Sequence, residues 1–208
     1  ESKDEELQKA TSLLKEKIPF MRDSYGHSML SVLGIYADKL IVAPLFGYSF
    51  LGNYQLSFQI LMILTMISGI VFSYLLPQEA SGRPHRKLWL ITILIVLVSS
   101  ILTIVLAPSV LPILMPKYVP AIDLIQIMSI AAVSMTITLR YTSKFLANEK
   151  SKIVIIGKAI YLSSHMIGIF SIGTIFGIQG VAISFVIASS IEAIYFVTVN
   201  RILDNKNK

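Results

Sequence analysis

The sequence contains no cysteine among its 208 residues, which excludes disulfide bonds, thiolate metal sites and cysteine nucleophiles. Charged residues are scarce as well: they make up 14% of the chain, against about a quarter in an ordinary soluble domain. Asp, Glu, Lys and Arg are absent from three long runs, residues 40–78, 88–116 and 159–191. A membrane helix needs about 20 apolar residues, and a soluble domain of this size cannot bury so much apolar surface. The composition therefore excludes a soluble enzyme and a disordered chain, and it predicts a polytopic membrane protein.

Motifs for cofactor chemistry are missing too. The three histidines show no metal-ligand spacing, and the chain has neither a glycine-rich phosphate loop nor a nucleophile elbow around any serine. We therefore expect no enzyme activity and no cofactor. The net charge of +6 is typical of cytoplasmic loops in a membrane protein, so we expect no nucleic-acid partner. Because the charged first 17 residues contain no apolar core and begin with Glu1, we expect a fragment without a signal peptide.

The apolar runs predict an all-α fold, a six-helix transmembrane bundle preceded by a short amphipathic segment. Residues 1–17 form the expected cytoplasmic amphipathic linker, 18–200 the bundle and 201–208 a cytoplasmic tail. The predicted spans are residues 19–46, 54–76, 88–107, 121–147, 153–176 and 178–199. The links at 47–53 and 177–180 are short and contain glycine, which predicts tight antiparallel hairpins. A proline-rich break at 108–120 separates the third span from the fourth.

The distribution of basic residues predicts the orientation of these spans. With the N-terminus in the cytoplasm, 14 of the 18 Lys and Arg residues fall on the cytoplasmic side and only Lys117 falls outside. Lys39, Arg140 and Lys158 account for the rest and lie within spans. We therefore expect a multi-pass protein of the cytoplasmic membrane, in contact with membrane lipids and with both termini in the cytoplasm.

Polar side chains recur at helical spacing within five of the six predicted spans, which favours a bundle around a hydrated cavity. The third span has no such stripe and is expected to face lipid. Ionisable groups inside a membrane cost about 2.5–3.5 kcal/mol each on insertion scales, so they are candidates for function. The candidate cavity-binding residues are Asp38, Gln55, Gln59, Arg140, Lys158, His165 and Glu192. Arg140, Lys158 and His165 would make the cavity cationic, and that suits an anionic phosphate or diphosphate substrate.

Each candidate also has a purely structural interpretation. Lys158 lies near a cytoplasmic helix end and Arg140 about two turns from one, so both side chains could extend toward water. Lys39 would extend outward while Asp38 faces inward. Asp38 and Glu192 could form structural ion pairs with neighbouring helices. His165 could hydrogen-bond a carbonyl group rather than relay protons. The two glutamines, Gln55 and Gln59, could hold helices together.

Several segments resemble the polysaccharide flippases of the multidrug/oligosaccharidyl-lipid/polysaccharide exporter superfamily. These segments are residues 36–42 (YADKLIV), 51–58 (LGNYQLSF), 111–121 (LPILMPKYVPA), 145–147 (FLA) and 177–184 (GIQGVAIS). The resemblance covers about residues 18–200 and implies the C-terminal six-helix lobe of a two-lobe transporter. Asp38 matches the family's aspartate position.

The resemblance implies export of an anionic lipid-linked glycan by alternating access, together with an N-terminal lobe that this chain lacks. A cation-coupled multidrug antiporter of the same superfamily is the first alternative. The second is a membrane assembly subunit that does not transport and whose polar stripes bind other helices.

Overall fold

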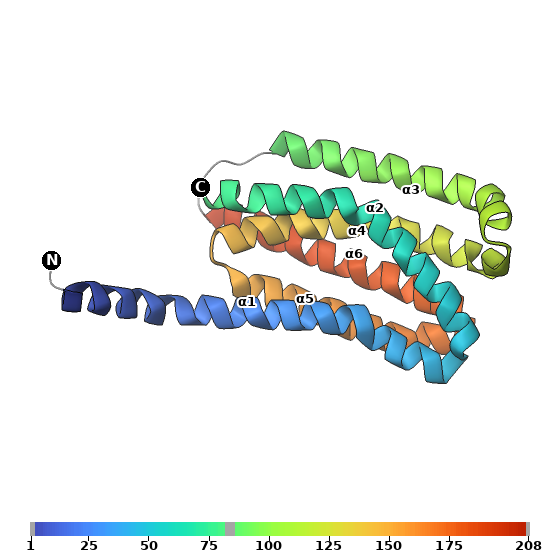
Figure 1. Cartoon of the computed structure of the whole chain (residues 1–208), viewed down its shortest axis with the longest axis horizontal. Helices are drawn as coiled ribbons and strands as arrows, with labels where there is room; N and C mark the ends of the chain where they lie inside the picture. Colours follow the sequence, from blue (N-terminus) through green and yellow to red (C-terminus); the bar gives the residue numbers. More distant parts are fainter. Residues whose placement is uncertain (1–2, 82–85, 207–208) are drawn as a thin grey trace.

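The computed structural model describes residues 3–81 and 86–206, and within them the chain is helical, with no strand (Figure 1). Backbone groups in lipid must pair within their own segment, which is why apolar runs of this length fold as helices. The chain ends at 1–2 and 207–208 and the link at 82–85 lie outside the described residues, as do most side chains of the expected amphipathic linker, residues 1–17. The helices are α1 (Lys3–Phe46), α2 (Tyr48–Ala80), α3 (Arg86–Leu114), α4 (Ile122–Ala147), α5 (Ser151–Gly168) and α6 (Thr174–Lys206).

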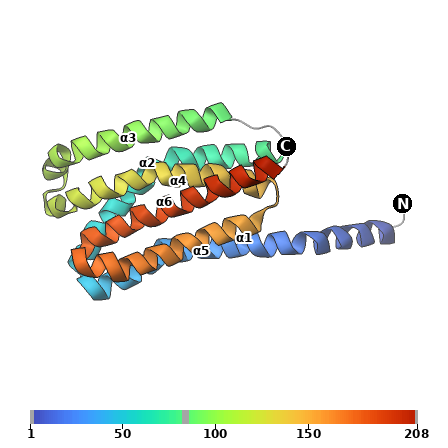
Figure 2. The same ribbon diagram turned by 180° about the vertical axis from the view of Figure 1, so that it is seen from behind.

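Five of the described helical segments are long and apolar enough to cross a membrane. They are Lys17–Phe46, Tyr48–Ala80, Lys87–Leu114, Pro116–Ala147 and Ser151–Asn205. The predicted count of six spans is therefore not confirmed, because the last segment contains both the fifth and the sixth predicted span. This segment is not straight: the backbone at Gly177 leaves the helical region, with φ 62° and ψ −143°. The α5 and α6 helices consequently lie side by side (Figures 1 and 2).

The helix ends differ from the sequence expectations at three places. The α1 helix runs unbroken from Lys3, so the expected amphipathic segment and the first span form one helix that projects beyond the bundle (Figure 1). The α3 helix continues through Pro108 and Pro112, and the turn that follows it is a short 3₁₀ helix, Pro116–Ala121. The predicted link at 47–53 shrinks to Gly47, whose φ of 91° is one that glycine adopts freely.

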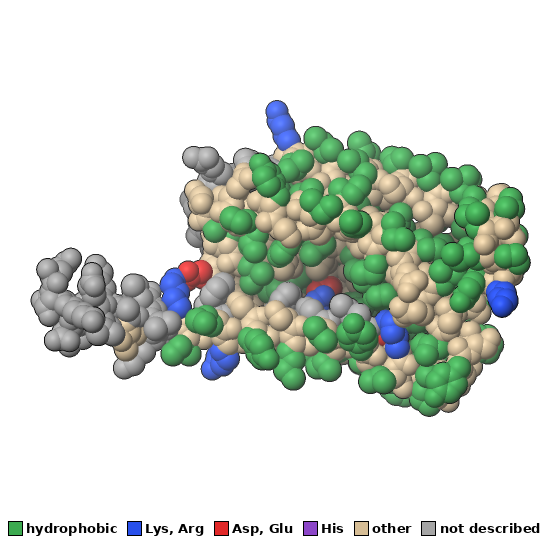
Figure 3. All heavy atoms as spheres, viewed as in Figure 1, with side chains coloured by type: hydrophobic (Ala, Val, Ile, Leu, Met, Phe, Trp, Pro, Cys, Tyr) green, Lys and Arg blue, Asp and Glu red, His purple; other side chains and the backbone are tan. Residues whose placement is uncertain are grey.

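The α4 helix occupies the centre of the bundle and contacts α2, α3, α5 and α6. The α3 helix lies at one edge, against α4 and α2, and many of its apolar side chains are exposed (Figures 1 and 3). At the opposite edge α1 packs mainly along α5. The α2 helix begins after the turn at Gly47 and runs away from α1 (Figure 1). A five-residue π-helix, Ile169–Gly173, joins α5 to α6. This arrangement brings side chains of α1, α2, α4, α5 and α6 around one interior region.

Candidate functional site

The first charged cluster is centred on Asp38 of α1, whose side chain is fully buried. The Tyr54 hydroxyl of α2 donates a hydrogen bond to Asp38 Oδ2 at 2.5 Å. The other carboxylate oxygen, Oδ1, accepts the backbone N–H of Lys39 at 2.7 Å and lies 3.3 Å from Lys39 Nζ. Both oxygens of this buried anion are therefore bound, as a carboxylate held out of water requires.

Lys39 does not extend away from Asp38, which differs from the expectation that its side chain would reach outward. Its side chain is only 15% exposed, and Nζ sits 3.9 Å from the centroid of the Phe58 ring. A lysine ammonium above an aromatic face is attracted by the ring quadrupole, so Phe58 adds to the attraction of the Asp38 carboxylate. Asp38 and Lys39 together carry no net charge.

His165 of α5 also belongs to this cluster. Its Nδ1 lies 3.1 Å from the hydroxyl of Ser184 on α6, so it bonds a side chain rather than a backbone carbonyl. Its Nε2 lies 3.8 Å from Asp38 Oδ2, beyond hydrogen-bond distance, and has no other partner among the described residues. The ring is fully buried and packs edge-on against Phe185 and stacked with Tyr161.

The second charged cluster is an ion pair between neighbouring helices. Lys158 Nζ of α5 lies 3.1 Å from Oε1 and 3.4 Å from Oε2 of Glu192 on α6. The Glu192 side chain is 4% exposed and that of Lys158 is 19% exposed. Lys158 therefore turns into the bundle toward Glu192 instead of toward a helix end. This outcome matches the structural alternative for Glu192, an ion pair with a neighbouring helix.

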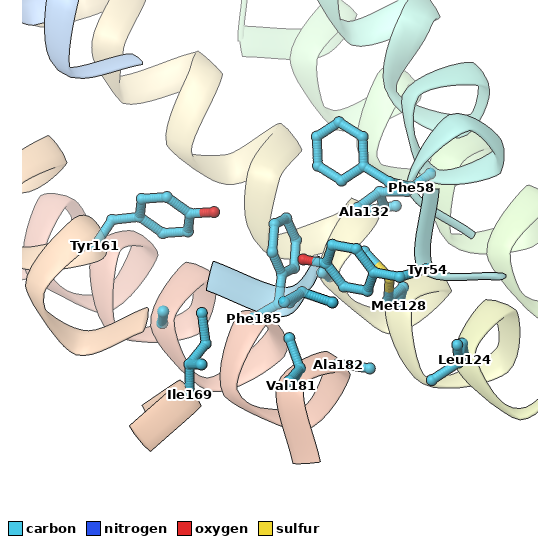
Figure 4. Packing of buried hydrophobic residues seen from close by; sticks show 14 of the residues in the cluster. Tyr54, Phe58, Leu124, Met128, Ala132, Tyr161, Ile169, Val181, Ala182 and Phe185 are labelled. Carbon is cyan, nitrogen blue, oxygen red and sulfur yellow. The ribbon is translucent and has the colours of Figure 1, made fainter. Parts of the chain in front are cut away.

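Two aromatic residues link the clusters. Lys158 Nζ lies 4.9 Å from the centroid of the Tyr161 ring, and the same ring stacks with His165 at a centroid distance of 5.9 Å. Phe185 packs edge-on against both Tyr161 and Phe58. In the view of Figure 4, Tyr161 and Tyr54 point toward each other from opposite sides, with the Phe185 ring between them. The two clusters thus share one wall of packed rings.

A cavity of about 150 Å³ adjoins this wall. Its lining comes from five helices: Gly34 of α1, Phe58 and Met62 of α2, residues 135, 138 and 139 of α4, Lys158 and Tyr161 of α5, and Phe185, Ser189 and Glu192 of α6. The lining contains one cation, Lys158, and one anion, Glu192. The arrangement is therefore close to neutral, which differs from the cationic cavity expected from the sequence. Figure 3 shows acidic and basic atoms at the bottom of a hollow on one face of the bundle.

The remaining predicted residues lie apart from these clusters. Arg140 does not line the cavity, although its neighbour Leu139 does; its guanidinium lies 5.6 Å from the Tyr141 ring. It forms no ion pair with any residue that the structure describes, unlike Lys39 and Lys158. Gln55 is half-buried and Gln59 is exposed, both on α2. The structure thus brings together Asp38 and His165, and separately Lys158 and Glu192, but not Arg140 or the glutamines.

Other polar stripes of the sequence form contacts between helices. Ser68 of α2 and Thr136 of α4 have hydroxyl groups 2.8 Å apart, and both side chains are buried. Gln126 of α4 donates to the carbonyl of Ile104 on α3 at 2.8 Å. These bonds connect neighbouring helices in the way that polar side chains do within membranes.

Sequence reasoning did not single out three residues that matter here. Tyr54 and Ser184 appear there only within the segments 51–58 and 177–184, and Thr138 is not singled out at all. In the described part of the chain no three His, Asp or Glu side chains lie close enough together to hold a metal ion. The described side chains offer hydrogen bonding, charge pairing and aromatic contact.

Comparison with known proteins adds no assignment. No model of a known protein family, no curated protein and no solved structure matches this chain.

Proposed function

We propose that this chain is one lobe of a membrane transporter that moves an anionic lipid-linked glycan across the cytoplasmic membrane. The observation that carries transport is the pair of buried charged clusters around Asp38 and Glu192, set among segments apolar enough to span a membrane. Ionisable side chains inside a membrane mark substrate or ion pathways by default, because their burial is costly. The substrate class rests on the flippase resemblance of residues 36–42, 51–58 and 111–121.

Arg140 is the residue that best suits the anionic part of such a substrate. It is a permanently charged, planar donor without an acidic partner in the described structure, and guanidinium groups bind phosphate oxygens in pairs. Lys158 is less available, because Glu192 already offsets its charge. If the helical segments before and after Gly177 each cross the membrane, the proposed lobe makes six passes and has both termini in the cytoplasm.

The test is export of lipid-linked glycan in cells whose native gene containing this chain is deleted or replaced by a variant. Arg140→Glu should abolish export while membrane insertion stays normal, and Arg140→Lys should retain part of it. Arg201→Glu is the matched control, because Arg201 is exposed at the end of α6. Normal export by Arg140→Glu would remove Arg140 from the substrate path, and no loss of export on deletion of the gene would refute the flippase proposal.

A cation-coupled multidrug antiporter is the second candidate, and the Asp38 cluster is the observation that favours it. A fully buried carboxylate next to a histidine with an unpartnered Nε2 is a group that could exchange a proton or a cation during transport. This candidate predicts proton- or sodium-dependent drug efflux that is lost in Asp38→Asn and in Glu192→Gln. Efflux that continues without either ion gradient would exclude it.

A further inference from the structure

The cavity beside Lys158 and Glu192 contains two buried polar atoms without hydrogen-bond partners in the described structure. These are Thr138 Oγ1 and Glu192 Oε1, and both residues line the cavity. Oε1 lies 3.1 Å from Lys158 Nζ in an ion pair but accepts no aligned hydrogen bond. Glu192 is 3% exposed and Thr138 is 6% exposed, so bulk water does not cover them. Buried polar groups are nearly always hydrogen-bonded, and two exceptions in one cavity indicate a polar occupant.

The chemistry of these atoms selects the kind of occupant. A carboxylate oxygen only accepts hydrogen bonds, so the group next to Glu192 must donate one. A phosphate oxygen cannot do so and would be repelled by the carboxylate. An ammonium group is disfavoured for a different reason, because Lys158 Nζ already lies 3.1 Å from the same oxygen. A neutral hydroxyl group meets both conditions.

The rest of the lining fits a small ring that carries hydroxyl groups. Phe58, Tyr161 and Phe185 present aromatic surface, and Ser189 adds a further hydroxyl. Binding sites of this kind combine apolar walls with a few polar groups that fix orientation. The volume of about 150 Å³ holds several water molecules, or one unit the size of a monosaccharide.

We propose that this cavity is a sugar pocket in which a hydroxyl of the carried glycan donates to Glu192 and another bonds Thr138. This inference rests on the proposed function for the identity of the glycan. It differs from it in assigning sugar recognition to the interior of this bundle, between α4, α5 and α6, and apart from Arg140. Lys158 acts here by neutralising Glu192, so that the pocket accepts an uncharged ring.

The test measures equilibrium binding to the full native protein in lipid nanodiscs. The probes are a polyprenyl diphosphate carrying one N-acetylhexosamine, the same lipid without sugar, and a free methyl glycoside of N-acetylglucosamine. We expect the sugar to strengthen lipid binding about tenfold, as one hydrogen bond to a charged acceptor does. Thr138→Val and Glu192→Gln should each remove most of this difference. Thr92→Val is the matched control, since the Thr92 hydroxyl bonds the Leu88 carbonyl on α3.

The outcomes separate this inference from the proposed function. Equal binding of both lipids, with no effect of Thr138→Val, would overturn the sugar pocket and leave the flippase proposal intact; the cavity would then hold water only. If neither lipid bound, the flippase proposal would fail, and the methyl glycoside would decide about the pocket. Binding of the glycoside that is weakened by Thr138→Val would support it, and absence of glycoside binding would overturn it.

Discussion

Replacing Tyr54 with phenylalanine removes one hydroxyl group from the centre of the bundle and leaves the ring in place. The lost group donates to Asp38 Oδ2 at 2.5 Å, and both side chains are fully buried. His165 Nε2 is 3.8 Å from the same oxygen and does not replace the bond at that distance. Tyr54→Phe therefore leaves one oxygen of a buried carboxylate without its donor.

The expected loss of stability in Tyr54→Phe follows from two ranges of hydrogen-bond energy. Hydrogen bonds to charged groups contribute about 1.5–3 kcal/mol to protein stability. Bonds between helices inside membranes contribute less, about 0.6 kcal/mol on average and about 1.7 at most, because the unfolded helices also find partners. The Tyr54–Asp38 bond is charge-assisted and fully buried, so we expect the overlap of the two ranges, a loss of about 1.5 kcal/mol. This corresponds to roughly a tenfold change in the unfolding equilibrium constant.

The measurement is reversible unfolding of the purified native protein in mixed micelles with increasing dodecyl sulfate. Tyr74→Phe is the matched control, because Tyr74 lies on the same helix and is 60% exposed. It should change the free energy of unfolding by less than about 0.5 kcal/mol. A double-mutant cycle of Tyr54→Phe with Asp38→Asn should give a coupling energy of about 1 kcal/mol or more. Equal effects of the two tyrosine variants, or a coupling near zero, would refute the importance of this bond.

Two glycine substitutions test the packing of α5 against α6 in the same unfolding assay. A Cβ atom at Gly168 would lie 2.4 Å from Ser184 Cβ, so Gly168→Ala should destabilise the protein by about 1–3 kcal/mol. Gly69→Ala is its control, since a Cβ there meets no atom within 4 Å, and equal stability of the two variants would contradict the close approach. Gly177→Ala should cost about 1–3 kcal/mol, because φ 62° and ψ −143° lie in a region that essentially only glycine adopts. Gly177→Asn should cost a similar amount, because this conformation is not the left-handed helical one that asparagine tolerates. An unchanged stability in Gly177→Ala would argue against the reversal at this residue.

The sequence alone predicts which face of the fifth span points into the bundle. Lys158, Tyr161 and His165 recur at spacings of three and four, and they are the only ionisable groups in their stretch of apolar sequence. Because charge in lipid is costly, a face that carries it must point into the bundle. The structure places all three in the interior, in contact with α1 or α6.

The partners of these groups do not follow from the sequence. Helical periodicity gives the direction of a side chain but not which neighbouring helix it meets or at what height. Arg140 and Thr136 share a stripe, yet Thr136 is buried against Ser68, whereas Arg140 finds no acidic partner in the described residues. Thr138 gives no sequence signal, because its importance lies in the partner that it lacks.

The residues at which the helices end could not be predicted from the sequence either. Proline and glycine predict interruptions, but Pro108 and Pro112 lie within α3. A membrane helix tolerates proline because neighbouring groups and local adjustments satisfy the freed backbone positions. The turns at Gly47 and Gly177 each depend on one residue with positive φ, so both hairpins are tighter than composition alone would suggest.

The two charged clusters differ in how they connect the helices. Asp38 and Lys39 both belong to α1, so their ion pair moves with that helix as a unit. Lys158 and Glu192 bridge α5 and α6, two helices whose backbones approach closely at Gly168. A displacement of α1 relative to α2 would therefore leave both ion pairs intact. It would break the Tyr54–Asp38 bond instead, and with it the contact of Lys39 with the Phe58 ring. Because these contacts hold α1 to α2, Tyr54→Phe should alter that junction selectively and leave the Lys158–Glu192 pair unchanged.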